Sequence, residues 1–134
     1  MKKFKHMPKE YWPDENSHVE YKEVYRGIKN IDTLSVDDFL PWNIEFKNRK
    51  KTFKNEFKQP EFGMSIFTDL DSLKETVEKY PGLKNKTKGY AKGFTSLDRG
   101  ISPKEDNKHH VDYYLYDYEH NSPKDDFEII EVNK

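Results

Sequence analysis

The sequence contains no cysteine, and this absence excludes disulfide bonds, thiolate metal ligands and a cysteine nucleophile. No stretch approaches the roughly 18 apolar residues that a membrane-spanning helix needs. The first residues, MKKFKHMPKEYW, are basic but lack the apolar run of a signal peptide. We therefore expect a cytoplasmic protein that does not enter a membrane, and we predict neither a bound metal nor a resident cofactor.

Large apolar side chains of four common types are also scarce, since Leu, Ile, Val and Phe together number only 29 of the 134 residues. Such a fraction approaches the range in which chains stay disordered. Two features oppose disorder: the net charge is only −1, and the chain has nine Phe, nine Tyr and two Trp. Each aromatic ring can bury roughly 150–250 Å². The length is that of one domain, and we expect a thin, aromatic-rich core beneath a heavily charged surface.

The clearest local pattern is the segment 63–82, GMSIFTDLDSLKETVEKYPG. Its apolar run at 64–67 predicts a short buried strand. Apolar side chains over 70–80 then recur at the spacing of one helical face. Thr68, three residues before Asp71, is expected to cap this helix, and the Pro-Gly pair that follows is expected to end it.

Four further segments have the composition or the alternation of strands, namely residues 19–28, 90–94, 111–118 and 127–132. Ser35 is expected to cap a brief helical turn, and residues 83–88 are expected to be a polar connector. Strands separated by loops rather than by regular helices favour an α+β fold. We predict a curved, mostly antiparallel sheet of five to six strands, with the main helix (about 70–80) packed on it.

The domain is predicted to span residues 19–134, preceded by a flexible N-terminal arm at residues 1–18. The arm is polar, contains two prolines and shows no periodicity. Two aromatic residues within it, Tyr11 and Trp12, either pin the arm to the domain or stay exposed.

Two segments carry aromatic side chains suited to binding. Residues 47–58 are rich in lysine with interleaved phenylalanines, a pattern that can hold single-stranded nucleic acid by phosphate contact and base stacking but that a solvated face also has. The alternation in 111–118 places Tyr114, Tyr116 and Tyr118 on one face. These tyrosines either form a binding platform or are covered by a neighbouring element.

Arginine and histidine side chains are the first candidates for chemistry. Arg26, next to Tyr25, can present its planar donor fork to a phosphate or carboxylate, or can pair with a glutamate. His109 and His110 point to opposite faces of a strand, which disfavours a shared metal ion. Either histidine can instead act in catalysis or orient a substrate, because imidazole titrates near neutral pH.

Two hydroxyl residues beside the predicted helix are further candidates. Ser65 follows a glycine by two residues, but a nucleophile elbow needs a second glycine at the position of Phe67. Thr68 lies at the helix N-terminus, where free amides can bind an anion, although the nearby Asp69 and Asp71 repel one.

The order of these residues is similar to the layout of small ADP-ribosyltransferase-like domains. In that family an early arginine or histidine, a Ser or Thr on a middle strand and a late glutamate or its equivalent surround NAD. The resemblance implies that Arg26 faces the phosphates and that Ser65 or Thr68 supports Arg26. Glu119 and Glu128 are candidates for the late glutamate. The chain also resembles small bacterial or phage single-domain proteins of unassigned function that carry Tyr-Arg, Asp-Phe and His-His in this order.

Function is predicted less directly than fold, because the sequence shows no complete catalytic constellation. We expect first a macromolecule-binding or regulatory domain that contacts another protein through the tyrosine face or the basic segment. The alternative is an enzyme of NAD or nucleotide chemistry, with Arg26, Ser65 and His109 or His110 converging on a cleft. Nucleic-acid binding through the basic segment is a further alternative, and no oligomeric state is predicted.

Overall fold

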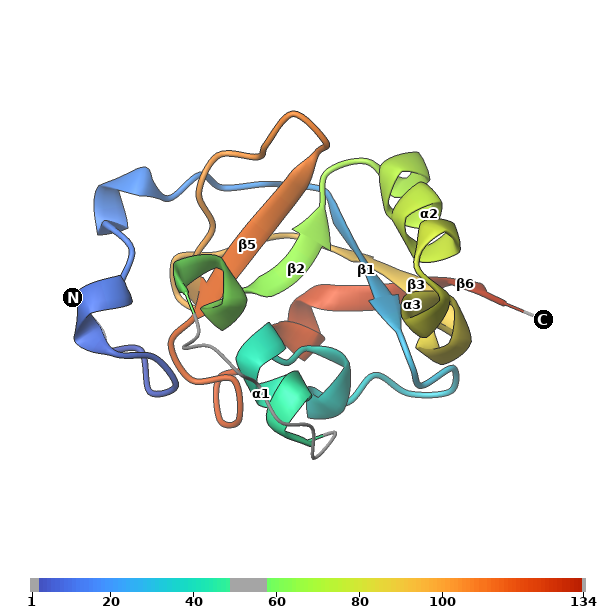
Figure 1. Ribbon diagram of the computed structural model, residues 1–134, viewed down its shortest axis with the longest axis horizontal. Helices are drawn as coiled ribbons and strands as arrows, with labels where there is room; N and C mark the ends of the chain where they lie inside the picture. Colours follow the sequence, from blue (N-terminus) through green and yellow to red (C-terminus); the bar gives the residue numbers. More distant parts are fainter. Residues whose placement is uncertain (1–2, 49–57, 134) are drawn as a thin grey trace.

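Figure 1 shows the computed structural model of the chain, which describes residues 3–48 and 58–133. Six strands form one sheet in the order β4-β5-β2-β1-β3-β6, and all the paired strands are antiparallel. The strands are β1 (Val24–Ile28), β2 (Met64–Phe67), β3 (Gly89–Gly93), β4 (Gly100–Ile101), β5 (His110–Leu115) and β6 (Phe127–Val132). The predicted α+β domain with an antiparallel sheet is therefore confirmed.

Within the described residues there are three α-helices: α1 (Trp42–Asn48), α2 (Leu70–Lys79) and α3 (Pro81–Lys86). Helix α2 packs against β1 and β2, and α3 follows it immediately (Figure 1). Short 3-10 turns occupy residues 9–11, 15–17, 36–38, 59–62 and 123–126. Across the part of the chain that the structure describes, no helix has the length and apolarity to cross a membrane.

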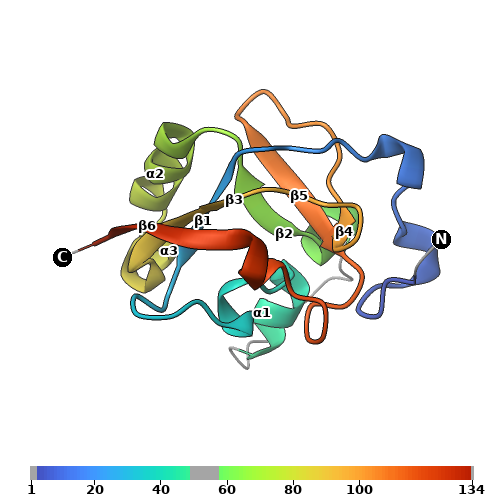
Figure 2. The ribbon, with the colours of Figure 1, turned by 180° about the vertical axis from the view of Figure 1, so that it is seen from behind.

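The sheet consists of two halves that meet at one pair of residues. Strand β1 pairs along its whole length with β3, and β2 pairs along its whole length with β5. Between the halves, β1 and β2 are in register at Tyr25 and Phe67. From that pair the two strands diverge like the arms of a V, with α1 below the opening (Figures 1 and 2). Backbone groups inside the V need partners other than a neighbouring strand.

The central segment folds as predicted, with two differences at its ends. Strand β2 is buried at Met64, Ile66 and Phe67, as its apolar run requires. Helix α2 is capped by Asp69, which accepts a hydrogen bond from the Ser72 amide at 3.0 Å, so the predicted cap at Thr68 was wrong. The Pro-Gly pair ends α2 but also opens α3, because proline fits the first turn of a helix.

Other segments also differ from prediction. The strand predicted over 111–118 runs from His110 to Leu115, so Tyr116 and Tyr118 lie beyond its end. Residues 83–88 were predicted to be a connector, but residues up to Lys86 continue α3. The strand predicted over 19–28 begins only at Val24. Before it, the Val19 amide donates to the Ser102 carbonyl at 2.7 Å and the Tyr21 amide donates to the Thr95 hydroxyl at 2.9 Å. Residues 19–23 therefore form hydrogen bonds with a loop carbonyl and a side-chain hydroxyl instead of the regular hydrogen bonds between paired strands.

Residues 3–18, hereafter the arm, lie at one end of the molecule beside β5 (Figure 1). Phe4 and Met7 are buried, and the Tyr11 ring stacks on Phe62 at 5.5 Å between centroids. The Trp12 indole donates to the Met7 carbonyl at 3.1 Å. Of the two alternatives for Tyr11 and Trp12, the structure shows pinning. The flexibility of the arm stays a prediction.

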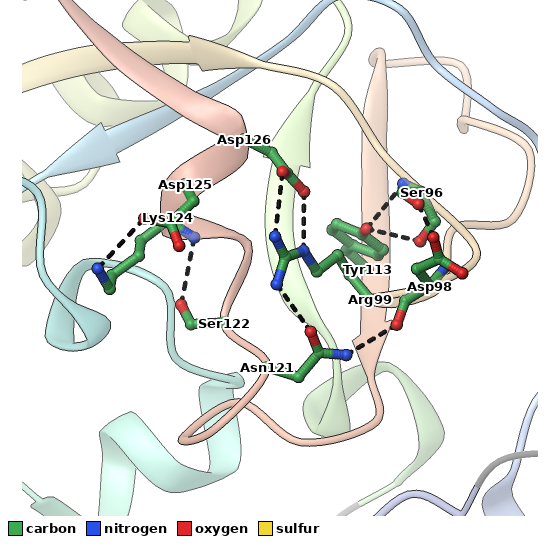
Figure 3. A network of polar contacts seen from close by, with 9 residues as sticks. All are labelled: Ser96, Asp98, Arg99, Tyr113, Asn121, Ser122, Lys124, Asp125 and Asp126. Carbon is green, nitrogen blue, oxygen red and sulfur yellow. Dashed lines mark hydrogen bonds and ion pairs between the residues drawn. The ribbon is translucent and has the colours of Figure 1, made fainter.

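Polar contacts link the loop before β4, strand β5 and the 3-10 turn before β6 (Figure 3). The Arg99 guanidinium donates to both Asp126 carboxylate oxygens, at 3.1 and 3.3 Å, and to Asn121 at 2.7 Å. The hydroxyl of buried Tyr113 donates to the Ser96 carbonyl at 3.0 Å and accepts from the Ser96 amide at 2.9 Å. The loop before β4 is therefore tied to the centre of β5.

We predict that Tyr113→Phe destabilises the protein by about 1–3 kcal/mol, because the variant leaves the Ser96 amide without its acceptor. Chemical denaturation followed by circular dichroism measures this loss. Tyr80→Phe is the matched control, since Tyr80 is 52% exposed, and its cost is expected to stay below about 0.5 kcal/mol. Equal costs for the two variants would contradict the structural role of the Tyr113 hydroxyl.

Candidate functional site

The guanidinium of Arg26 fills the opening of the V between β1 and β2. Its Nη1 donates to the Ser65 carbonyl at 2.7 Å, and its Nε donates to the Asp38 carbonyl at 2.6 Å. Its Nη2 lies 3.7 Å from a Glu45 carboxylate oxygen, and both side chains are about one-tenth exposed. The arginine thus supplies the donors that an adjacent strand would otherwise provide to β2, and it holds three separate segments together.

Two carboxylates complete this buried group. Asp38 is 1% exposed and accepts from the backbone amides of Lys29, Asn30 and Ser35 at 2.7, 3.2 and 3.1 Å. This turn agrees with the predicted helical turn at Ser35. On the other side of Arg26, Glu45 also pairs with Lys86 of α3.

The charge of Glu45 is maintained by its cationic neighbours. Burial by itself raises the pKa of this carboxyl, but Arg26 and Lys86 outweigh burial and bring the pKa down to about 2. Glu45 is therefore ionised at neutral pH, and the cluster of Arg26, Glu45 and Lys86 is fully charged.

Ser65, His110 and Asp112 project from the same face of β2 and β5. In the sheet register, Ser65 lies opposite Asp112 and Phe67 lies opposite His110. Residues two apart on a strand share a face, so the four side chains are neighbours. The Ser65 hydroxyl and His110 Nε2 share a hydrogen bond, and Asp112 Oδ1 lies 3.7 Å from the same nitrogen. Burial raises the pKa of Asp112, although the nearby His110 lowers it.

The charged cluster around Arg26, together with Ser65 and His110, borders one cavity of about 470 Å³, which Asp112 does not line. Arg26, Ser65 and His110 all line it, so the convergence predicted for an enzyme is present for His110. The apolar part of the wall comes mainly from α2 and α3. The charged part comes from Arg26, Lys29, Asp38, Glu45 and Lys86. The main apolar lining residues are Leu40, Trp42, Phe67, Leu73, Val77, Tyr80 and Leu83.

A second hollow of about 370 Å³ lies on the other side of His110. It is lined by Asp106 and Asp112, and also by Asp14 from the arm. His110 therefore lines both the cavity beside Arg26 and a hollow with three carboxylates. The sequence interpretation missed Asp112 as a site residue. Asp112 lies two residues after His110, and residues two apart on a strand share a face. The strand was predicted to begin at residue 111, so this rule was not applied to His110.

The remaining candidates lie apart from this cavity wall. Thr68 donates its hydroxyl to Glu105, and the same carboxylate oxygen lies 3.1 Å from His109 Nδ1. The Thr68 hydrogen bond is the largest effect that lowers the pKa of Glu105. His109 has a positive φ of 64° and does not line the cavity with His110. The Tyr25 hydroxyl donates to Glu23, which raises the tyrosine pKa to about 12.

The tyrosine face is covered rather than exposed. Tyr114 and Tyr116 are 4% and 5% exposed, and Tyr118 is half-buried. Phe4 of the arm lies on Tyr116, with 4.8 Å between the ring centroids. Cover by a neighbouring element is thus the alternative that the structure shows. Most of the basic segment 47–58 lies outside the described residues, and nucleic-acid binding by it stays a prediction.

No protein-family model, curated protein or solved structure matches this chain. The site is therefore interpreted from its own geometry. Arg26 donates to the Ser65 backbone carbonyl and makes no hydrogen bond with the Ser65 hydroxyl among the contacts described above. The serine hydroxyl is directed to His110 instead.

Proposed function

We propose that the cavity binds NAD or a related nucleotide and that the chain is an enzyme of ADP-ribosyltransferase-like type. The observation that carries this proposal is the convergence of Arg26, Ser65 and His110, which are separated by 39 and 45 residues in sequence, on one cavity. Its volume of about 470 Å³ falls within the range of roughly 300–1,000 Å³ that is typical of small-molecule sites.

Charge and shape both favour a nucleotide over a neutral ligand. Three cations, Arg26, Lys29 and Lys86, line the cavity against two anions, Asp38 and Glu45. Guanidinium groups bind phosphate through paired N–H donors, and Arg26 has five donors in all. The apolar wall from α2 and α3 suits the flat face of a base or a nicotinamide ring.

The reaction proposed is cleavage of the bond between nicotinamide and the ribose C1′. Nicotinamide leaves with the bonding electron pair, water forms a new bond to C1′, and one proton is released. We assign acceptance of that proton to His110, and its hydrogen bond with the Ser65 hydroxyl supports this assignment. Asp112 supplies a carboxylate beside His110, in the place of the late acid that Glu119 and Glu128 were expected to fill. Asp112 does not line the cavity itself, so its role is to stabilise the imidazole of His110 once that ring has accepted the proton.

Incubation with NAD labelled in the nicotinamide ring tests the proposal. We expect the wild-type protein to release labelled nicotinamide and His110→Ala to release it at least roughly 100-fold more slowly, as for loss of a general base. Ser65→Ala is expected to slow release as well. His120→Ala is the control and is expected to match the wild type, because its side chain is 80% exposed. Absence of both NAD binding and nicotinamide release from the wild type would sink the proposal.

A further inference from the structure

The arm covers a surface made by Phe62, Ile101, Tyr114 and Tyr116, hereafter the aromatic surface. Phe4 and Met7 pack with these four residues in one buried cluster, and Tyr11 and Trp12 border it. One backbone bond, from the Lys5 amide to the Tyr116 carbonyl at 3.0 Å, joins the arm to the segment after β5. The arm also contributes Pro13, Asp14 and Ser17 to the hollow beside His110.

Two histidines help to hold the arm, together with the Gln59 side-chain amide, which donates to the Tyr11 carbonyl at 2.9 Å. The first of the two is His6. Its Nε2 lies 2.7 Å from the Phe62 carbonyl oxygen. A carbonyl only accepts, so Nε2 carries the proton. The other nitrogen, Nδ1, is buried and has no hydrogen-bond partner among the described residues. A proton added to Nδ1 would be a buried donor without an acceptor, which is costly.

The second histidine, His18, stands where the arm joins the domain. Its Nδ1 accepts from the Ser102 amide at 3.0 Å, so that nitrogen carries no proton in the closed structure. Its Nε2 is buried and unpartnered within the residues described. If His18 Nδ1 gained a proton, its N–H group would face the N–H group of Ser102. The hydrogen bond between the two residues would then be lost.

The charged groups around the two rings are few. The Tyr118 ring lies edge-on to His6 at 5.7 Å, and the adjacent Lys5 pairs with Asp117 at 2.6 Å. Glu20 is the acid whose charge acts on His18, and Lys104 lies two residues beyond Ser102. Burial lowers the pKa of both histidines, against smaller opposing effects of the Phe62 carbonyl on His6 and of Glu20 on His18.

We propose that His6 and His18 form an acid-sensitive latch: protonation of the two rings releases the arm, uncovers the aromatic surface and opens the hollow beside His110. The Val19 amide bond to the Ser102 carbonyl, at 2.7 Å, lies just beyond the latch and marks the hinge. The uncovered surface includes Tyr114 and Tyr116, two of the three tyrosines at which a protein contact was predicted from the sequence. The latch proposal is independent of the proposed NAD reaction, because release of the arm requires no NAD.

The sign of the pH dependence follows from the neutral closed state. Both rings bind protons more weakly when the arm is closed, so closure is favoured above their ordinary pKa of 6.5 and is weakened as pH falls below it. If both rings titrate together, the equilibrium between open and closed changes by up to about 100-fold per pH unit.

Hydrogen exchange measured by mass spectrometry tests the latch in the full-length protein. From pH 7.5 to pH 5 we expect backbone exchange in residues 3–18 to rise at least roughly tenfold after correction for the chemical exchange rate, with β1, β2 and β3 still protected. Trp12 fluorescence in a Trp42→Phe background is expected to shift to the red over the same range. Unchanged arm exchange in the wild type at the two pH values would overturn the proposal.

Neutral replacements separate the latch from general acid effects. His6→Gln keeps a donor for the Phe62 carbonyl, and His18→Asn keeps an acceptor for the Ser102 amide. The double variant is expected to keep its arm closed down to pH 5, and the exposed His120→Gln is expected to respond as the wild type. A double variant that opens with the pH dependence of the wild type would also overturn the proposal.

Discussion

Replacing Arg26 with methionine is expected to destabilise the protein by about 3–5 kcal/mol, the usual cost of removing one partner from a buried ion pair. The Ser65 and Asp38 carbonyls lose donors at 2.7 and 2.6 Å, and Glu45 keeps its buried charge without the arginine. Methionine retains most of the side-chain volume, so the loss measures the polar contacts rather than a cavity. Urea unfolding at pH 7 provides the measurement.

Two further variants test this explanation. Lys84→Ala removes an ion pair with Glu78 in which both side chains are at least 60% exposed, and its cost is expected to stay below about 1 kcal/mol. The double variant Arg26→Met/Glu45→Met removes both buried charges and is expected to recover part of the loss. If Arg26→Met costs no more than Lys84→Ala, the arginine does not organise the V between β1 and β2.

The same variant has an expected pH signature. Glu45 has its pKa lowered from 4.5 to about 2 in the folded protein, because Arg26 and Lys86 outweigh the effect of burial. Its contribution to stability is therefore complete above pH 4.5 and is lost as pH falls toward 2. Without Arg26 the folded pKa rises, and the loss is expected to begin at a higher pH. A series of unfolding curves from pH 7 to pH 3 measures both profiles.

The elements that were predictable from the sequence are those whose pattern is local. The strand and helix between residues 63 and 80 have an apolar run followed by apolar residues at helical spacing, and burial at Ile66, Leu73 and Val77 follows from these patterns. Pro81 was ambiguous, since proline both ends one helix and opens the next. A local sequence pattern does not tell whether a given proline only ends a helix or also begins another one.

The candidate site was not predictable in the same way, because its residues are brought together by pairing between segments that are distant in the sequence. The position of Arg26 is fixed by the divergence of β1 from β2, which no periodicity indicates. Asp112 joins Ser65 and His110 because of the register between β2 and β5. Likewise, alternation placed Tyr114 and Tyr116 on one face but could not show that the arm covers it, because an exposed and a covered aromatic face have the same sequence pattern.

Substituting Gly100 with alanine is expected to cost roughly 2–4 kcal/mol, because the new methyl group has no space. An added Cβ would lie 2.1 Å from the Tyr114 carbonyl oxygen and 2.8 Å from the Leu115 Cα. Both atoms belong to β5, which pairs with β4 through this glycine. Backbone atoms cannot rotate away, so the variant must separate β4 from β5 and expose Ile101, which is fully buried. Exposing one such side chain costs roughly 1.5–3 kcal/mol.

Gly82→Ala is the matched control for this prediction. An added Cβ at Gly82 meets nothing within 4 Å, and the residue lies within α3. Alanine there is expected to stabilise the protein by about 0.4–1 kcal/mol, since it restricts the unfolded chain. Thermal and urea unfolding of the two variants give shifts of opposite sign if the close approach of β4 to β5 is correct. Equal shifts, or a neutral Gly100→Ala, would show that β4 does not pack against β5 at this glycine.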